Sequence, residues 1–242
     1  RVRNTTLSKP GLGRFKAIPT KEETAEKLIE NFFEIPASDV AKRRTRTKVE
    51  DTVVILDSSG SVGNCEFDKG RTALKDMMMI SRDNYENYYA GVVYSTTATV
   101  NFQFLSASEA AKKMDEFSYE GGDTNTADGL SKAYDLIFDP NSGSHFPSKK
   151  MVFLVTDGQS NENQDQTIPN AEDLKSAGVQ IYVVAVGDFT NGINEIVDIA
   201  TRPKKHLFRV KTFGDFLDVV KLVVKRVDRD TYEVVGDIPP PC

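Results

Sequence analysis

The segment Thr52-Val53-Val54-Ile55-Leu56-Asp57-Ser58-Ser59-Gly60-Ser61 decides the fold of this 242-residue chain. Its first five residues are β-branched or apolar without interruption, which is typical of a strand buried on both faces of a parallel sheet. The polar residues 57–61 follow directly and must form a loop at the carboxyl end of that strand. The segment therefore predicts an α/β domain with polar side chains at the carboxyl edge of its sheet.

Strand and helix patterns alternate on the carboxyl side of this segment. Further strands are predicted at Tyr89–Tyr94, Ala98–Phe104, Met151–Thr156, Val179–Val186 and His206–Lys211, and helices at about 66–82, 107–117, 126–138, 167–177, 192–200 and 213–227. Ser95-Thr96-Thr97 joins the first two of these strands as a hairpin. The alternation predicts a doubly wound, mostly parallel six-stranded sheet with one antiparallel edge strand and helices on both faces. Such sheets bind ligands beyond the carboxyl ends of their strands.

The main domain is expected at residues 51–227, between a basic N-terminal extension (1–50) and an extended C-terminal tail (228–242). In the extension, Thr20 and Glu23 form a capping box that begins a helix at about 21–34. The apolar stripe of this helix must be buried, so we expect it to dock on the main domain. Three consecutive prolines, Pro239–Pro241, favour an extended tail.

The charge of the chain is unevenly distributed. Residues 1–50 carry 12 Lys and Arg against 7 Asp and Glu, although the whole chain has a formal net charge of −5. The main domain is therefore acidic, which argues against nucleic acid as its ligand. The basic run 42–48 is expected to be a solvated linker, and attraction of an anionic partner is the alternative. No apolar run reaches the ~18–20 residues that span a membrane, so membrane insertion is not expected. The sequence begins at Arg1 without an apolar signal stretch, as a processed or excised product would.

Three loops are predicted to bring oxygen atoms to the same edge of the sheet. The first holds Asp57, Ser59 and Ser61, the second is Gly121-Gly122-Asp123-Thr124-Asn125-Thr126, and the third is Thr156-Asp157-Gly158. Hydroxyls, carboxylates and water favour a hard cation, with Mg²⁺ first and Mn²⁺ or Ca²⁺ as alternatives. Because serine and threonine hydroxyls are neutral, much of the cation's charge would remain available for an acidic side chain of a partner. This is a binding mechanism in which no bond is broken.

Together these loops resemble the metal-ion-dependent adhesion site of von Willebrand factor type A (VWA) domains, and the resemblance covers about residues 51–227. It implies that Ser59, Ser61 and Thr124 are direct or switchable metal ligands. It implies that Asp57 and Asp157 act directly or through water. The chain is most similar to the extracellular-matrix branch of the family, with matrilins, collagen VI and byssal thread matrix proteins.

The resemblance implies a secreted matrix or adhesion module that binds a matrix protein, with collagen preferred, through an acidic residue. The alternative is an intracellular VWA scaffold for complex assembly. An enzyme of the haloacid dehalogenase type would need a second carboxylate two residues after Asp57, where Ser59 stands. No glycine-rich nucleotide motif, P-loop or nucleophile elbow is present either. We therefore expect no enzymatic activity and no small-molecule substrate.

Several residues near the loops have simpler interpretations. Any one of the five predicted ligands, taken alone, would be interpreted as a helix cap. Thr126 is expected to cap the helix that follows it. Tyr119 and Asn161 flank the loops, where they are either partner contacts or ordinary loop residues. His145 and His206 are expected at the surface and not as metal ligands.

The two cysteines, Cys65 and Cys242, form neither a disulfide scaffold nor a zinc motif. The 14 residues from Asp228 to Pro241 can span ~45 Å at ~3.3 Å per residue, so the tail can reach Cys65. We expect a disulfide between the two, and a reactive Cys65 thiol at the start of a helix is the alternative. The triplet Asn4-Thr5-Thr6 is a glycosylation sequon, which fits a secreted protein.

Overall fold

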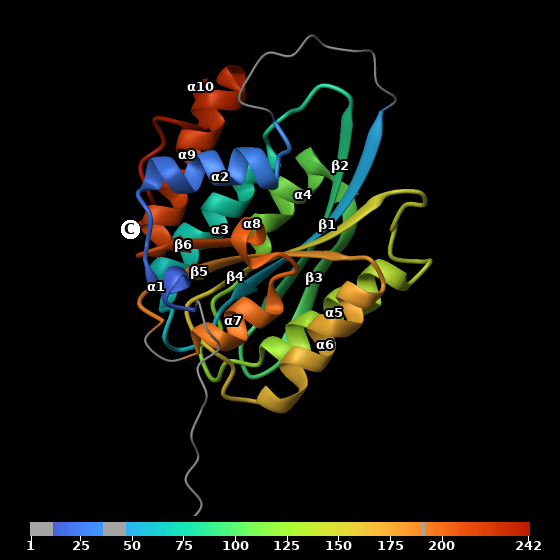
Figure 1. Cartoon of the computed structure of the whole chain (residues 1–242). Coiled ribbons are helices and arrows are strands. Elements are labelled where there is room, and N and C mark those ends of the chain that lie inside the picture. The colour runs from blue at the N-terminus through green and yellow to red at the C-terminus, as the bar shows by residue number, and fades with distance from the viewer. Residues whose placement is uncertain (1–11, 36–46, 190–191) are drawn as a thin grey trace, which may run out of the picture.

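A six-stranded sheet in the order β3-β2-β1-β4-β5-β6 separates two layers of helices (Figure 1). The computed structural model describes residues 12–35, 47–189 and 192–242. Strand β3 is antiparallel to β2, and all other neighbouring strands are parallel. This confirms the predicted sheet. The strands are β1 (Lys48–Asp57), β2 (Tyr85–Tyr94), β3 (Ala98–Ser106), β4 (Lys149–Thr156), β5 (Gln180–Val186) and β6 (Leu207–Val210).

Strand β1 shows how one run of apolar residues supports both layers. Val53 and Ile55 pack into one core, whereas Val54 and Leu56 pack into the other, because successive side chains point to opposite faces. The first core lies under α5, α6 and α7, and the second under α2, α3, α4 and α9. The longer helices of the main domain are α3 (Asn64–Met78), α4 (Ala107–Lys113), α5 (Thr126–Phe138), α6 (Gln164–Ser176), α7 (Ile193–Ile199) and α9 (Phe213–Val227).

Three short elements were not predicted from the sequence. They are α1 (Gly13–Lys16), α8 (Pro203–His206) and α10 (Arg229–Val235). The first two span one turn each, which is too short for a periodic pattern of apolar residues to be visible. The helix predicted at about 107–117 consists of α4 followed by the 3₁₀ turn η1 (Met114–Glu116). Helix α10 corrects the expectation that the whole segment 228–242 is extended.

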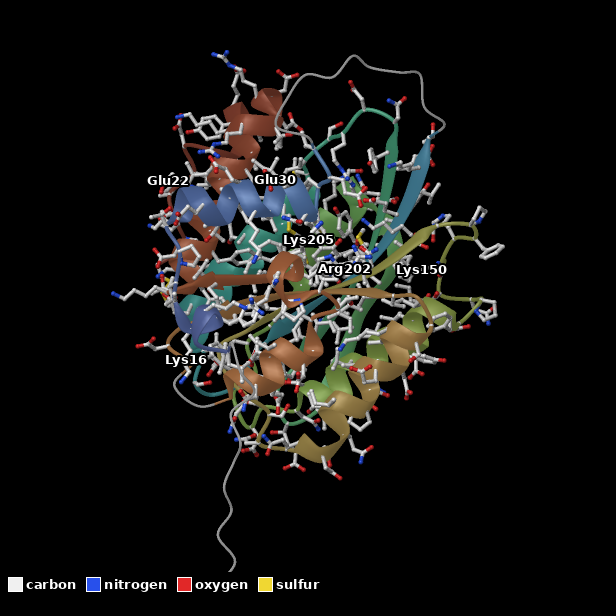
Figure 2. The ribbon with its side chains drawn as sticks, viewed as in Figure 1. Lys16, Glu22, Glu30, Lys150, Arg202 and Lys205 are labelled. Carbon is white, nitrogen blue, oxygen red and sulfur yellow. A yellow bond between two sulfur atoms is a disulfide. The ribbon has the colours of Figure 1, made fainter. Side chains whose placement is uncertain are left out.

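The N-terminal extension packs against the main domain through α2 (Lys21–Asn31). The predicted capping box between Thr20 and Glu23 is present. Helix α2 lies along α9 and carries Glu22 and Glu30 on its outer, exposed side (Figure 2). Directly after the helix, the ring of Phe32 packs edge-to-face on three other rings. Helix α2 and the residues directly after it are therefore integral to the second core, whereas Leu12 packs into the first.

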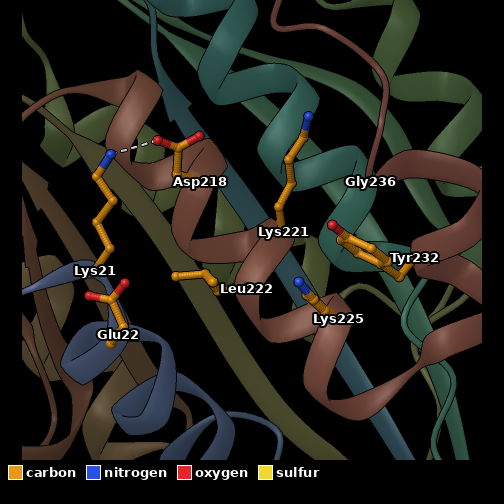
Figure 3. Close-up of a pocket in the computed structure, with 8 residues that line it drawn as sticks. All are labelled: Lys21, Glu22, Asp218, Lys221, Leu222, Lys225, Tyr232 and Gly236. Atoms are coloured by element: carbon orange, nitrogen blue, oxygen red, sulfur yellow. Dashed lines mark hydrogen bonds and ion pairs between the residues drawn. The ribbon is translucent and has the colours of Figure 1, made fainter.

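The tail turns back along α9 through α10. Asp228 caps α10, because its carboxylate accepts hydrogen bonds from the backbone N–H groups of Thr231 (3.0 Å) and Ser81 (2.8 Å). Where α10 meets α9 and α2, the side chains of Lys21, Lys221 and Tyr232 line a pocket of about 310 Å³ (Figure 3). Beyond the helix, the chain reaches α3, and Cys242 forms a disulfide with Cys65 at a Cα–Cα distance of 6.0 Å.

His206 is buried, which corrects the expectation of a surface residue. Only 3% of its surface is exposed, and its ring stacks on Tyr182 with centroids 4.1 Å apart. Burial, together with the positive charges of Arg202 and Lys149, lowers the pKa of His206 from 6.5 to about 4. His145 is about one-third exposed, and its Nδ1 lies 2.9 Å from Oδ1 of the buried Asp51.

We expect the low pKa of His206 to make the fold sensitive to acid. The unfolded chain binds the imidazole proton near pH 6.5 and the folded chain only near pH 4. Stability that is present above pH 6.5 is therefore lost as the pH falls through this window, by on the order of 3 kcal/mol. Urea unfolding at several pH values measures the loss. His206→Gln should flatten the curve between these two values, and an unchanged curve would contradict the assignment.

Candidate metal centre

The first loop is organised around the buried carboxylate of Asp57, the last residue of β1. Its Oδ1 accepts a hydrogen bond from the backbone N–H of Ser59 (2.9 Å). Its Oδ2 accepts from the hydroxyls of Thr156 (2.7 Å) and Tyr94 (3.1 Å). Burial raises the pKa of Asp57, and these hydrogen bonds oppose the rise. The carboxylate is thus fixed in position behind the loop.

The second loop lies against the first through backbone contacts. The N–H of Gly60 donates to the carbonyl of Gly122, and the N–H of Gly121 donates to the carbonyl of Ser58, both at 2.9 Å. Gly121 and Gly122 have φ values of +72° and +99°, which favour glycine. A Cβ on Gly122 would also lie 2.7 Å from the hydroxyl oxygen of Thr96. The paired glycines therefore allow the two loops to approach closely.

The third loop brings Asp157 to the serines. The hydroxyl of Ser61 donates to Oδ1 of Asp157 (2.9 Å), and the hydroxyl oxygens of Ser59 and Ser61 lie 3.1 Å apart. Burial, and next the charge of Asp57, raise the pKa of Asp157 to about 6. Burial and a like charge both destabilise the ionised form of this carboxylate, and a bound cation would stabilise it.

Thr124 is buried in the second loop and is connected to the third. Its backbone N–H donates to Oδ1 of Asn161 (2.7 Å), and its carbonyl accepts from the backbone N–H of Asn161 (3.0 Å). The hydroxyl of Tyr119 donates to the carbonyl of Ser59 (3.4 Å). Asn161 and Tyr119, which were expected beside the loops, therefore hold the loops in place.

The helix after the second loop is capped one residue earlier than predicted. The side chain of Asn125 accepts the backbone N–H of Asp128 (3.1 Å), so Asn125 is the cap. The hydroxyl of Thr126 instead donates to the hydroxyl of Tyr94 (3.4 Å), which the sequence indicated only as part of a strand. Tyr94 thus links this helix to Asp57, and no sequence motif identified it.

The chemistry of the three loops fits a hard cation. Two carboxylates and several hydroxyls meet there, and sulfur and imidazole ligands are absent from the loops. Elsewhere in the described parts of the chain, no group of three or more His, Cys, Asp or Glu side chains could hold a metal ion.

Other expectations concern the remainder of the chain. Within residues 12–35, 47–189 and 192–242, no helix is long and apolar enough to cross a membrane. Asn4 and most of the basic run 42–48 lie outside the described residues.

Comparison with known proteins gives consistent results for sequence and fold. The family model of the von Willebrand factor type A domain matches residues 51–222. The human (Homo sapiens) collagen alpha-6(VI) chain is 32% identical over 167 residues, which are 67% of this chain and 7% of that one. Matrilin-3 of Gallus gallus is 30% identical over 175 residues, which are 68% of this chain and 37% of that one. The chain therefore spans only a small part of these relatives.

A solved structure with the same fold is proximal thread matrix protein 1 from the mussel byssus. It has a TM-score of 0.62 and 23% identity, and the match covers 74% of this chain and 48% of that one. A second structure of that protein has a zinc-occupied metal-ion-dependent adhesion site; it has a TM-score of 0.60 and 23% identity, and the match covers 74% and 46% of the two chains. By the extent of the family match, the present chain belongs to the von Willebrand factor type A domain family.

Proposed function

We propose that this chain is an extracellular adhesion module that binds a matrix protein, with collagen preferred, through a divalent cation. Asp57, Ser59, Ser61, Thr124 and Asp157 would hold the ion. The observation that carries the proposal is the convergence of three loops at the carboxyl edge of the sheet, where the hydroxyl oxygen of Ser61 lies 3.1 Å from that of Ser59 and 2.9 Å from Oδ1 of Asp157.

The ligand residues divide into two roles. The hydroxyls of the exposed Ser61 and of the buried Ser59 and Thr124 would coordinate directly. Asp57 is held from behind by Tyr94 and Thr156 and would fix the first loop. When bound, the ion supplies an open coordination position for a carboxylate of the partner. Mg²⁺ is the preferred ion, because it needs few protein carboxylates, and Mn²⁺ or Ca²⁺ are alternatives.

Two observations support a non-enzymatic, extracellular role. Ser59 occupies the position that the second carboxylate of a haloacid-dehalogenase-type phosphotransferase would need, and the sequence has no P-loop or nucleophile elbow. The disulfide between Cys65 and Cys242 favours an oxidising compartment over the alternative of an intracellular scaffold. The collagen and matrilin relatives support the same compartment.

Binding to immobilised collagen should depend on the metal and on Asp157. Asp157→Ala removes a charged oxygen that faces Ser61, so we expect it to abolish the binding that occurs in Mg²⁺ and disappears in EDTA. Surface plasmon resonance in both buffers measures this. The substitution removes the hydrogen bond that Asp157 accepts from the exposed Ser61, and this loss should change stability little. The circular dichroism and melting temperature of the metal-free variant should therefore stay close to those of the wild type.

Glu86→Ala is the matched control. It also removes one carboxylate, but Glu86 is exposed near the amino end of β2, at the opposite edge of the sheet. This variant should bind like the wild type. Collagen binding that is the same in Mg²⁺ and EDTA, and the same for Asp157→Ala, would refute the proposed mechanism.

A further inference from the structure

The third loop continues through residues 159–163 to the start of α6, and α7 holds it at Ser160. The backbone N–H of Ser160 donates to Oε1 of Glu195 (2.7 Å), which lies in the first turn of α7. The side-chain amide of Gln164, the first residue of α6, donates to the other oxygen of the same carboxylate (3.2 Å). The two helices pack side by side on one face of the sheet (Figure 1). One carboxylate therefore connects the third loop to both of them.

Ser160 is a fixed point of this loop, because only 1% of its surface is exposed and its hydroxyl is paired as well. The hydroxyl oxygen lies 2.9 Å from that of Thr167 in α6. A hydrogen bond from a backbone N–H to a carboxylate is charge-assisted, so it is stronger than one between neutral groups. A Cβ on Gly192, directly before α7, would lie 2.6 Å from the side chain of Gln159, so the loop and this helix are in contact. Without Glu195, the buried N–H would lose its acceptor, and the loop would shift to pair it elsewhere.

The anchor at Ser160 acts first on Asp157, which lies between two fixed points of the chain. Directly before it, the hydroxyl of Thr156 donates to the buried carboxylate of Asp57 (2.7 Å). Shortly after it, Ser160 is held by Glu195. With both ends of this short segment fixed, the carboxylate of Asp157 is kept at the serines of the first loop.

The same anchor acts on Thr124 through the next residue, Asn161. The backbone N–H of Asn161 donates to the carbonyl of Thr124 (3.0 Å), and its side-chain Oδ1 accepts the N–H of Thr124 (2.7 Å). These two bonds make Thr124 follow the position of Asn161, which is covalently joined to Ser160. A shift of Ser160 would therefore displace two predicted metal ligands that belong to two different loops.

We propose that Glu195 is a positioning residue of the metal centre. It acts through Ser160 on both Asp157 and Thr124 and is not itself a ligand. This role rests on the proposed function, because it needs a cation at the three loops. Residues that orient metal ligands from outside the coordination shell typically change metal affinity about 10–100-fold when they are replaced. Because the effect of Glu195 passes through a backbone hydrogen bond, no sequence motif indicates it.

Isothermal titration calorimetry of the full, oxidised chain with Mn²⁺ alone tests this role. Glu195→Ala should weaken Mn²⁺ binding about tenfold, because Asp157 and Thr124 lose their common anchor. Glu195→Gln keeps a side-chain oxygen for the N–H of Ser160 and should recover most of the affinity. In EDTA, hydrogen exchange at the amides of Ser160 and Asn161 should be faster in Glu195→Ala than in the wild type, and close to the wild-type rate in Glu195→Gln. This second readout needs no bound ion.

Asp228→Ala is the matched control. It also removes a carboxylate that accepts a backbone N–H from another segment, that of Ser81 (2.8 Å), but Ser81 leads into the amino end of β2, at the opposite edge of the sheet. This variant should lower the melting temperature and leave the Mn²⁺ affinity unchanged. Wild-type affinity in Glu195→Ala, or an equal loss of affinity in Asp228→Ala, would overturn the positioning role. A wild-type chain that does not bind Mn²⁺ would refute the proposed function itself, which separates the two failures.

Discussion

Phe32→Ala should lower the free energy of unfolding by about 3–5 kcal/mol, the range for removing a buried aromatic ring. Phe32 lies after the helix of the N-terminal extension, and 3% of its surface is exposed. Its ring packs on Phe33, Phe153 and Tyr182, with centroids 4.8–5.1 Å apart. Two of these rings belong to the central strands β4 and β5, so the substitution would weaken the packing of the extension on the centre of the sheet. Urea unfolding, followed by circular dichroism, measures the effect.

Phe146→Ala is the control for this prediction, because the same ring is removed where 98% of the side chain is exposed. Its effect should lie within about 0.5 kcal/mol of zero. If Phe32→Ala were equally mild, the extension would be a peripheral segment and not part of the second core. The metal should also be kept absent with EDTA, because ligand binding would add its own stability.

Replacing both cysteines by serine should lower the free energy of unfolding by about 2–5 kcal/mol. The disulfide between Cys65 and Cys242 closes a loop with a sequence separation of 177, so it strongly restricts the unfolded chain. The bond also joins the segment beyond α10 to the start of α3. Amide hydrogen exchange should also become faster in α10, whose buried apolar residue is Val235.

Reduction of the wild-type protein provides the comparison. It should lower the stability to that of the Cys65→Ser/Cys242→Ser variant, because both treatments remove the same bond. A double variant that unfolds at the wild-type urea concentration under oxidising conditions would show that the bond has no stabilising role. Collagen binding of the reduced protein, measured in parallel, would separate stability from function.

The sheet and its three loops could be predicted because the relevant signals are local. A strand buried on both faces leaves a continuous apolar run such as 52–56, and polar residues after it can only lie at its carboxyl end. The antiparallel edge was predicted for the same reason, since Ser95–Thr97 is too short for a crossover. The contact between Ser61 and Asp157 then follows from the parallel pairing of β1 and β4.

The features that could not be predicted depend on contacts between distant segments, or on which of two adjacent residues takes a given role. The burial of His206 follows from its stacking on Tyr182, a residue 24 positions earlier whose contact no local pattern indicates. Asn125 and Thr126 are both good caps, and only the path of the loop decides between them. Helix α10 begins because Asp228 can cap it, whereas the prolines that indicated an extended tail act only from residue 239.

Helix α2 also protects the edge of the sheet that is formed by β6. Strand β6 is an edge strand, and edge strands can pair with a strand of another molecule and start aggregation. Here the ammonium group of Lys27 donates to the carbonyl of Leu207, and the hydroxyl of Thr24 is shared between the carbonyls of Thr20 (3.0 Å) and Arg209 (3.4 Å). Two carbonyls that a foreign strand would need are thus occupied within the chain itself. At high protein concentration, this protection would keep separate copies of the domain from pairing through β6.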